Sequence, residues 1–96
     1  MKTPYQLFGV ECQSGWARLY EPIRARCQSA GVPILQVKEK FGGLRVYVGA
    51  ADPALLQAIE RAEQQSHTIC EVCGADHAAT TPDAGGWLRT RCASCP

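Results

Sequence analysis

Cys70-Glu71-Val72-Cys73 and Cys92-Ala93-Ser94-Cys95 are two Cys-x-x-Cys pairs with eighteen residues between them. One tight turn offers two thiolates to neighbouring corners of a tetrahedron, and a hairpin that returns the second pair fills the other corners. This spacing is typical of a four-cysteine zinc site, whereas disulfides or unrelated thiols are the alternative interpretations. We therefore predict one zinc ion bound by Cys70, Cys73, Cys92 and Cys95. Four protein ligands leave no open position on the metal, so this zinc is expected to be structural.

The length of 96 residues allows one domain at most, or a small core with an appendage that a metal holds together. We place a small α+β core in residues 1–67 and a four-cysteine zinc-binding module, packed on that core as one structural unit, in residues 68–96. The sequence has no run of about eighteen apolar residues, so no membrane span is predicted, and the start lacks a secretory signal. The expected setting is therefore a reducing cytoplasm, with thiolates bound to zinc and no membrane partner.

The charge is close to balanced, because ten Lys and Arg residues face nine Asp and Glu residues. The formal net charge of +1 becomes −1 when four thiolates bind one Zn²⁺ ion. Proteins that bind DNA without regard to sequence normally carry a marked basic excess. The total charge therefore argues against such a function.

The first helix is predicted from Ser14, a suitable N-cap, to about residue 30, where Gly31 gives a stop signal. Pro22 lies inside this pattern. It either kinks the helix or splits it into a turn at 15–20 and a helix from about 21 to 30. Two side chains of this helix are expected in the core, namely Trp16 and, as a small buried hydrophobe, Cys27.

Residues 1–13 give little information. Tyr5, Leu7 and Phe8 are compatible with a short strand, although Pro4 breaks any clear period. Cys12 has no predicted role.

Two strands, 34–40 and 44–49, are predicted on either side of Gly42-Gly43, a glycine pair suited to a tight hairpin turn. With this turn, Lys40 faces Arg45 and Lys38 faces Tyr47. One face is then apolar apart from Glu39 and is expected to receive the helices. Its members are Leu35, Val37, Phe41, Leu44, Val46 and Val48.

The opposite face contains Lys38, Lys40, Arg45 and Tyr47, here called the basic face, together with Gln36. Like charges directly across a strand pair repel each other. An acidic neighbour such as Glu11 on a further strand, or an external anion, would offset that cost. An ordinary solvated face is the alternative, since lysines often protect sheets from edge-to-edge association. The basic face is therefore the candidate binding surface outside the zinc module.

A second helix is predicted from Asp52-Pro53, an N-cap followed by proline, to about residue 66. His67 at its end is expected to have a structural role and not to bind metal. Trp87 is expected to pack over the metal site or against this helix. The predicted apolar stripe comprises Leu55, Leu56, Ile59, Ala62 and Ser66, and the solvent side comprises Glu60, Arg61, Glu63, Gln64 and Gln65.

The short distance from Cys95 to the last residue favours a zinc ribbon or a truncated treble clef for the C-terminal module. The predicted fold class is thus α+β, with a helix, a β-hairpin and a helix forming the core.

Three features together resemble a group of small uncharacterised proteins from bacterial genomes, prophages and phages. They are Trp16, the run Val37-Lys38-Glu39-Lys40-Phe41-Gly42-Gly43-Leu44-Arg45-Val46-Tyr47, and the tail with Cys70-Glu71-Val72-Cys73-Gly74 and Gly86-Trp87-Leu88-Arg89-Thr90-Arg91-Cys92. The resemblance implies this fold and a mobile-element setting, but no activity. Many members end in a Cys-x-x-His pair, whereas this chain has Cys92 and Cys95, and both ligand types suit zinc.

No enzymatic function is expected, because no nucleophile, base and orienting group stand in a recognisable pattern. His67 and His77 do not form the motif of His-Asn-His endonucleases, and no small-molecule substrate is predicted. The favoured function is a protein-interaction module or inhibitor of a host or phage complex, for example a CRISPR effector. The alternative is a nucleic-acid-binding zinc ribbon that contacts phosphates through Lys38, Lys40 and Arg45, with Tyr47 available for stacking.

Overall fold

A β-hairpin forms the centre of the fold, and the computed structural model describes the whole chain, residues 1–96. Strand β2 spans Ile34–Lys40 and strand β3 spans Gly43–Val48. Phe41 and Gly42 form the turn between them, with φ values of 55° and 79°. A type I′ turn requires positive φ at both central residues. The predicted hairpin is therefore present, but the predicted Gly42-Gly43 turn is wrong by one residue.

Contacts with distant parts of the chain explain why Gly42 lies in the turn and Gly43 in strand β3. A Cβ atom on Gly43 would lie 2.6 Å from Nε2 of His67, so any other residue in this strand position would displace the imidazole. The backbone of Gly42 is held from both sides. Its N–H donates to the Glu39 carboxylate at 2.7 Å, and its carbonyl accepts from Thr90 Oγ1 at 2.5 Å.

The register of the hairpin changes the predicted cross-strand partners. Lys40 lies opposite Gly43 and not opposite Arg45. The like-charged pair is instead formed by Lys38 and Arg45, so Lys38 does not face Tyr47 as predicted. The remaining pairs include Gln36 with Tyr47, Val37 with Val46, and Glu39 with Leu44.

The core face of the hairpin agrees with the prediction at its centre, where Val37, Leu44 and Val46 are buried. Phe41 was predicted on this face, but its side chain is 61% exposed because the residue belongs to the turn. Leu35 is half-buried beside an irregularity in the register between Ile34 and Gln36.

The N-terminal segment begins with a helix and not with the short strand that Tyr5, Leu7 and Phe8 would allow. Helix α1 spans Pro4–Phe8, and Thr3 closes a capping box with Gln6 at its start. Strand β1, Val10–Glu11, then pairs in parallel with β2 and completes a sheet in the order β1-β2-β3. Glu11 lies beside Lys38 in this register, which is the acidic neighbour that the sequence suggested.

Helix α2 spans Ala17–Ala30 and follows a 3₁₀ turn, η1, at Ser14–Trp16. It is one continuous helix across Pro22, so the predicted alternative of two separate elements is wrong. Ser14 does not cap it, because no side chain caps either the 3₁₀ turn or the helix. Gly31 ends the helix in the left-handed conformation, as its position indicated.

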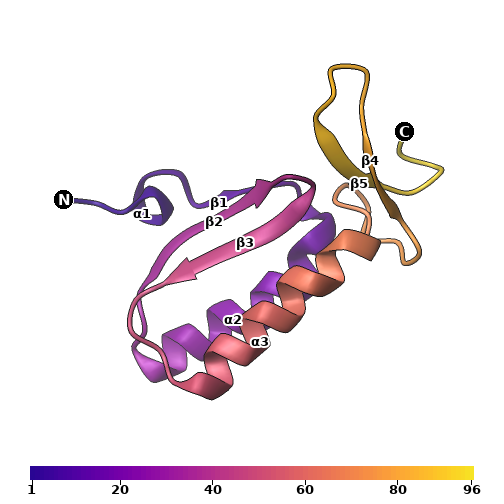
Figure 1. Ribbon diagram of the computed structural model, residues 1–96. Helices are drawn as coiled ribbons and strands as arrows, with labels where there is room; N and C mark the ends of the chain where they lie inside the picture. Colours follow the sequence, from indigo (N-terminus) through magenta and orange to yellow (C-terminus); the bar gives the residue numbers. More distant parts are fainter.

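Helix α3 spans Pro53–Gln65 and is capped by Asp52, as predicted, before a 3₁₀ turn, η2, at Ser66–Thr68. The two long helices lie side by side against one face of the sheet (Figure 1). Two details of α3 differ from the prediction. Leu56 is 49% exposed, and Glu63 points to the sheet, where its carboxylate accepts from the Val46 N–H at 2.9 Å.

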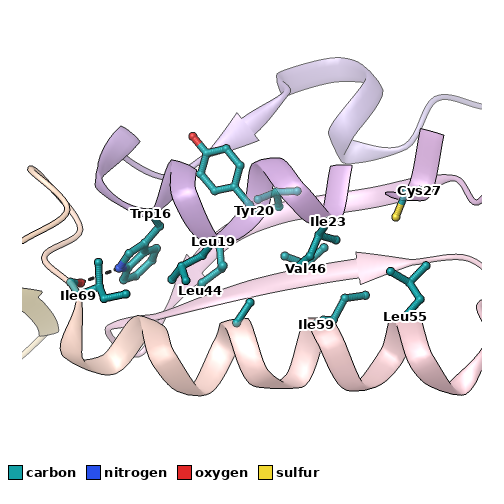
Figure 2. Packing of buried hydrophobic residues seen from close by; sticks show 12 residues of the cluster. Trp16, Leu19, Tyr20, Ile23, Cys27, Leu44, Val46, Leu55, Ile59 and Ile69 are labelled. Atoms are coloured by element: carbon teal, nitrogen blue, oxygen red, sulfur yellow. Dashed lines mark hydrogen bonds between the residues drawn. The ribbon is translucent and has the colours of Figure 1, made fainter. Parts of the chain in front are cut away.

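The hydrophobic core fills the space between these helices and the hairpin (Figure 2). Trp16 and Cys27 are buried at its two ends, as predicted. The cluster comprises Trp16, Leu19, Tyr20, Ile23, Cys27, Val37, Leu44, Val46, Leu55, Ile59, Ala62 and Ile69.

The C-terminal part is a second sheet made of β4, Ala79–Pro82, and β5, Leu88–Arg91, which project beside the turn of the first hairpin (Figure 1). Trp87 is 67% exposed at the start of β5, so the prediction that it covers the metal site or α3 is wrong. The α+β fold class with a zinc-ribbon-like C-terminal module is confirmed. The division into residues 1–67 and 68–96 stays a prediction.

Candidate metal centre and binding surface

The first Cys-x-x-Cys pair lies in a tight turn directly after η2. Gly74 has a φ of 81°, and its N–H donates to the Cys70 carbonyl at 2.9 Å, which closes the turn around the thiols. The Cys70 N–H in turn donates to the Ala75 carbonyl at 2.9 Å. Positive φ suits glycine at this point because glycine has no Cβ. Cys70 and Cys73 therefore face the same point in space.

The second pair is delivered by the β4–β5 hairpin. Asp83 holds the turn of this hairpin, because its carboxylate accepts from the N–H groups of Gly85 at 2.9 Å and Trp87 at 3.0 Å. Cys92 follows β5 directly, and the Cys95 N–H donates to the Cys92 carbonyl at 3.0 Å. This hydrogen bond closes the second turn around Cys92 and Cys95.

The four sulfur atoms all lie within 4.8 Å of one another, so they could hold a metal ion. The Sγ atoms of Cys73 and Cys92 are 3.6 Å apart. Thiolates at about 2.3 Å from a tetrahedral zinc ion stand about 3.8 Å from each other. The donor set and its dimensions therefore suit a tetrahedral metal ion.

The pKa values of two thiols in the cluster, Cys70 and Cys95, are shifted in opposite directions. Burial disfavours the Cys70 thiolate, but N–H groups from Cys73, Cys92 and Val72 outweigh burial and lower the pKa of Cys70 to about 6. Hydrogen bonds to the thiols of Cys73 and Cys92 raise the pKa of Cys95 to about 12. Metal ligands must be deprotonated thiolates, so a cation at the centre replaces the protons that the four sulfurs otherwise share.

Backbone contacts from the N-terminal half support the first pair. The Trp16 indole N–H donates to the Ile69 carbonyl at 2.7 Å, and the Gly15 N–H donates to the Glu71 carbonyl at 2.9 Å. A Cβ atom on Gly15 would overlap the Cys70 carbonyl oxygen, well inside 3.0 Å. The close approach of Gly15 thus fixes the backbone that carries a ligand.

Glu71 supports the candidate metal centre, a role that the sequence did not predict. Its side chain is almost fully buried, and the carboxylate accepts from Arg91 Nε at 2.9 Å. Its N–H also donates to the Thr90 carbonyl at 2.9 Å, so Glu71 ties β5 to the first cysteine turn. Two features of the sequence could have indicated this ion pair: Glu71 lies between the ligands Cys70 and Cys73, and Arg91 directly precedes Cys92.

Neither histidine belongs to the sulfur cluster. His67 packs against Gly43, and its Nδ1 lies 3.4 Å from Thr80 Oγ1, between the two sheets. His77 is exposed with a φ of 63°. The structure therefore places His67 in a packing position at the end of α3, as expected.

Cys12 lies half-buried in a cleft of about 400 Å³ between β1 and β5, which is also lined by Glu39, Glu71, Arg89 and Arg91. Burial, together with the charges of Glu71 and Glu39, raises the pKa of Cys12 to about 11. The thiol is thus held in its protonated, poorly reactive form at neutral pH. Both arginines of the cleft are already paired with carboxylates, Arg89 with Glu39 and Arg91 with Glu71.

The structure brings the residues of the basic face together on the side of the sheet opposite the helices. Lys38 and Arg45 are half-buried cross-strand neighbours, and Tyr47 is 40% exposed beside them. The Lys38 amino group lies 5.7 Å from the centre of the Tyr47 ring. At the end of the hairpin, Lys40 lies 5.4 Å from the ring of Phe41.

None of the three cations of the basic face forms an ion pair. Glu11 lies next to Lys38 in the register, but its carboxylate accepts from the Gln36 amide at 3.1 Å. Three cations and one carboxylate give this region a formal charge of +2. The basic face thus has a local charge that the net charge of the chain conceals.

No helix has the length and apolar character needed to cross a bilayer. Comparisons of this chain with protein-family models, curated proteins and solved structures gave no match.

Proposed function

We propose that this chain is a small non-enzymatic binding protein in which one structural zinc ion stabilises the C-terminal module and the basic face contacts an anionic partner. The four convergent thiols support zinc, which favours four sulfur ligands in a closed tetrahedral site. Zinc binding to the folded state also adds stability to a chain whose core is small. The reducing cytoplasm of a bacterial host, as the mobile-element resemblance implies, keeps such thiols available for metal.

The metal is tested by elemental analysis of protein purified without chelator. One zinc per chain is expected, and Cys92→Ala should lose it because three thiolates hold zinc less tightly. Cys12→Ala is the matched control, since Cys12 lies outside the sulfur cluster and should not affect zinc content. Iron in place of zinc, or wild-type protein without metal, would contradict the proposal.

One observation carries the binding surface: Lys38 and Arg45 stand directly opposite each other without a carboxylate partner. Like charges across a strand pair destabilise the hairpin, and an external anion removes that cost. The near-neutral total charge does not oppose this function, because four other arginines are already paired with acids. These pairs are Arg18–Asp76, Arg24–Glu21, Arg89–Glu39 and Arg91–Glu71.

Retention on a heparin column tests the surface, because heparin is a dense polyanion. The triple variant Lys38→Gln, Lys40→Gln, Arg45→Gln should elute at clearly lower salt than the wild type. The matched control removes the same charge elsewhere, by Lys2→Gln, Arg26→Gln, Arg61→Gln, three exposed cations that also lack ion pairs. Equal elution of the two triple variants would overturn the proposed surface.

A second candidate function is an interaction module or inhibitor that docks on a host or phage protein complex, such as a bacterial defence complex. Exposed apolar side chains at the β4–β5 hairpin support it, since Trp87 is 67% and Leu88 is 38% exposed. Solvent-exposed aromatic residues of this kind often anchor protein partners. Stoichiometric co-purification with a protein complex after nuclease treatment, lost on Trp87→Ala, would favour this function over the first.

A further inference from the structure

We infer that the anionic partner of the basic face is single-stranded nucleic acid, whose phosphates contact Lys38, Lys40 and Arg45 while bases stack on Tyr47 and Phe41. The inference rests on the proposed function, because it needs the basic face as a contact surface. It goes further in naming the class of ligand. Aromatic rings together with cations that follow a backbone are the features that bind single strands.

The two rings are placed for such contacts by their neighbours. Tyr47 is 40% and Phe41 is 61% exposed, and a lysine amino group lies within 6 Å of the centre of each ring. The two lysines, Lys38 and Lys40, alternate along β2 with the buried Val37, so they point away from the helices. Each ring is therefore accompanied by a cation that is free to bind a phosphate.

Phe41 has no evident role in folding. It occupies the first central position of a type I′ turn, where Asn, Asp or Gly is favoured. A bulky residue with positive φ costs roughly 1–2 kcal/mol. Its ring recovers little of this cost by burial, because most of it is exposed to solvent. A contact with a ligand explains why this turn has an exposed aromatic ring despite the strain.

Single strands fit this surface better than duplexes or acidic proteins. In a duplex the bases are stacked on each other, so their faces are not accessible to side chains, whereas a single strand presents them. An acidic protein would satisfy the cations but would leave both rings unused. Tyr47 lies opposite Gln36, and Phe41 follows five residues later in the chain, so the two residues are about 16 Å apart along the hairpin backbone. That separation calls for a ligand of several nucleotides.

The experiment measures fluorescence anisotropy of zinc-loaded protein with a labelled oligothymidine of about twelve nucleotides, within the usual site size of single-strand binders. A mixed-sequence duplex of the same length serves as the comparison. The single strand should bind more tightly, and the logarithm of the affinity should fall with the logarithm of salt with a slope of about −2 for three phosphate contacts. Tyr47→Ala should weaken binding about tenfold or more.

Three further variants separate stacking from folding effects. Tyr47→Phe keeps the ring and should retain the affinity. Phe41→Asn removes the second ring but suits the turn, so it should weaken binding while the protein stays at least as stable. Phe8→Ala is the matched control, because Phe8 is 68% exposed on α1, outside the basic face, and its loss should not affect binding.

The outcomes distinguish the two proposals. Tighter binding to the duplex, no binding to the single strand, or full affinity in Tyr47→Ala would overturn the inference while heparin retention through the basic face still stands. Binding of a polyglutamate peptide in preference to the strand would likewise overturn it and identify an acidic protein as the partner. If the triple substitution does not change elution from heparin, the basic face is not a binding surface, and the proposed function fails as well.

Discussion

At the scale of single residues, Gly15 controls how closely the N-terminal half approaches the metal centre. A Cβ atom at this position would overlap both the Cys70 carbonyl oxygen and the Glu71 carbonyl carbon. Both are backbone atoms, so no side-chain rotation can relieve the overlap. The conformational freedom of Gly15 is therefore less important than its lack of a side chain.

Gly15→Ala should lower the free energy of unfolding by about 1–3 kcal/mol, because an added methyl group forces the backbone of the first cysteine turn to move. Denaturant unfolding of zinc-loaded protein measures this loss. Gly85→Ala is the control, since its nearest neighbour would be Trp87 Cδ1 at an ordinary contact distance of 3.4 Å. Similar stabilities of the two variants would show that the close packing at Gly15 is not required.

At the scale of secondary-structure elements, the two strands of the hairpin were predictable from the sequence, but the position of its turn was not. The glycine pair and the alternating residues predicted both strands, because these signals are local. The choice of Gly42 for the turn and Gly43 for the strand depends on His67 and Thr90, which come from distant parts of the chain. The turn was therefore one residue in error and each cross-strand partner two residues in error, an even shift that leaves the buried residues on the predicted face.

The buried centre of the hairpin supplies the test at this scale. Val46 is 5% exposed and packs between β3 and the helices, so Val46→Ala should cost about 1–3 kcal/mol in the free energy of unfolding. Leu56→Ala removes a larger apolar group that is 49% exposed and should change stability by less than about 0.5 kcal/mol. The two values are compared by chemical denaturation, and a larger loss at Leu56 would contradict the assignment of the core.

At the scale of the whole molecule, the sulfur cluster was the most predictable feature and its surroundings were the least. Four thiols at fixed spacing need only two local turns and one hairpin to converge. The burial of Glu71 and the exposure of Trp87 depend instead on how the second sheet packs beside the first. Contacts between residues 1–67 and residues 68–96 include the Trp16–Ile69 and Thr90–Gly42 hydrogen bonds and the Arg18–Asp76 ion pair.

These contacts couple the metal to the core, and Trp16 reports on the coupling. Its indole is fully buried and donates to Ile69, one residue before the first ligand, whereas Trp87 is exposed. In a Trp87→Phe variant the tryptophan fluorescence therefore comes from Trp16 alone.

Removal of zinc by a chelator should move this emission to longer wavelength and lower the melting temperature, because metal binding and folding are linked. If the emission does not move while amide exchange in residues 68–96 rises, the module unfolds without the core. In that case residues 1–67 are a separate folding unit. The Trp16 indole then stays buried in the core without its hydrogen bond to Ile69.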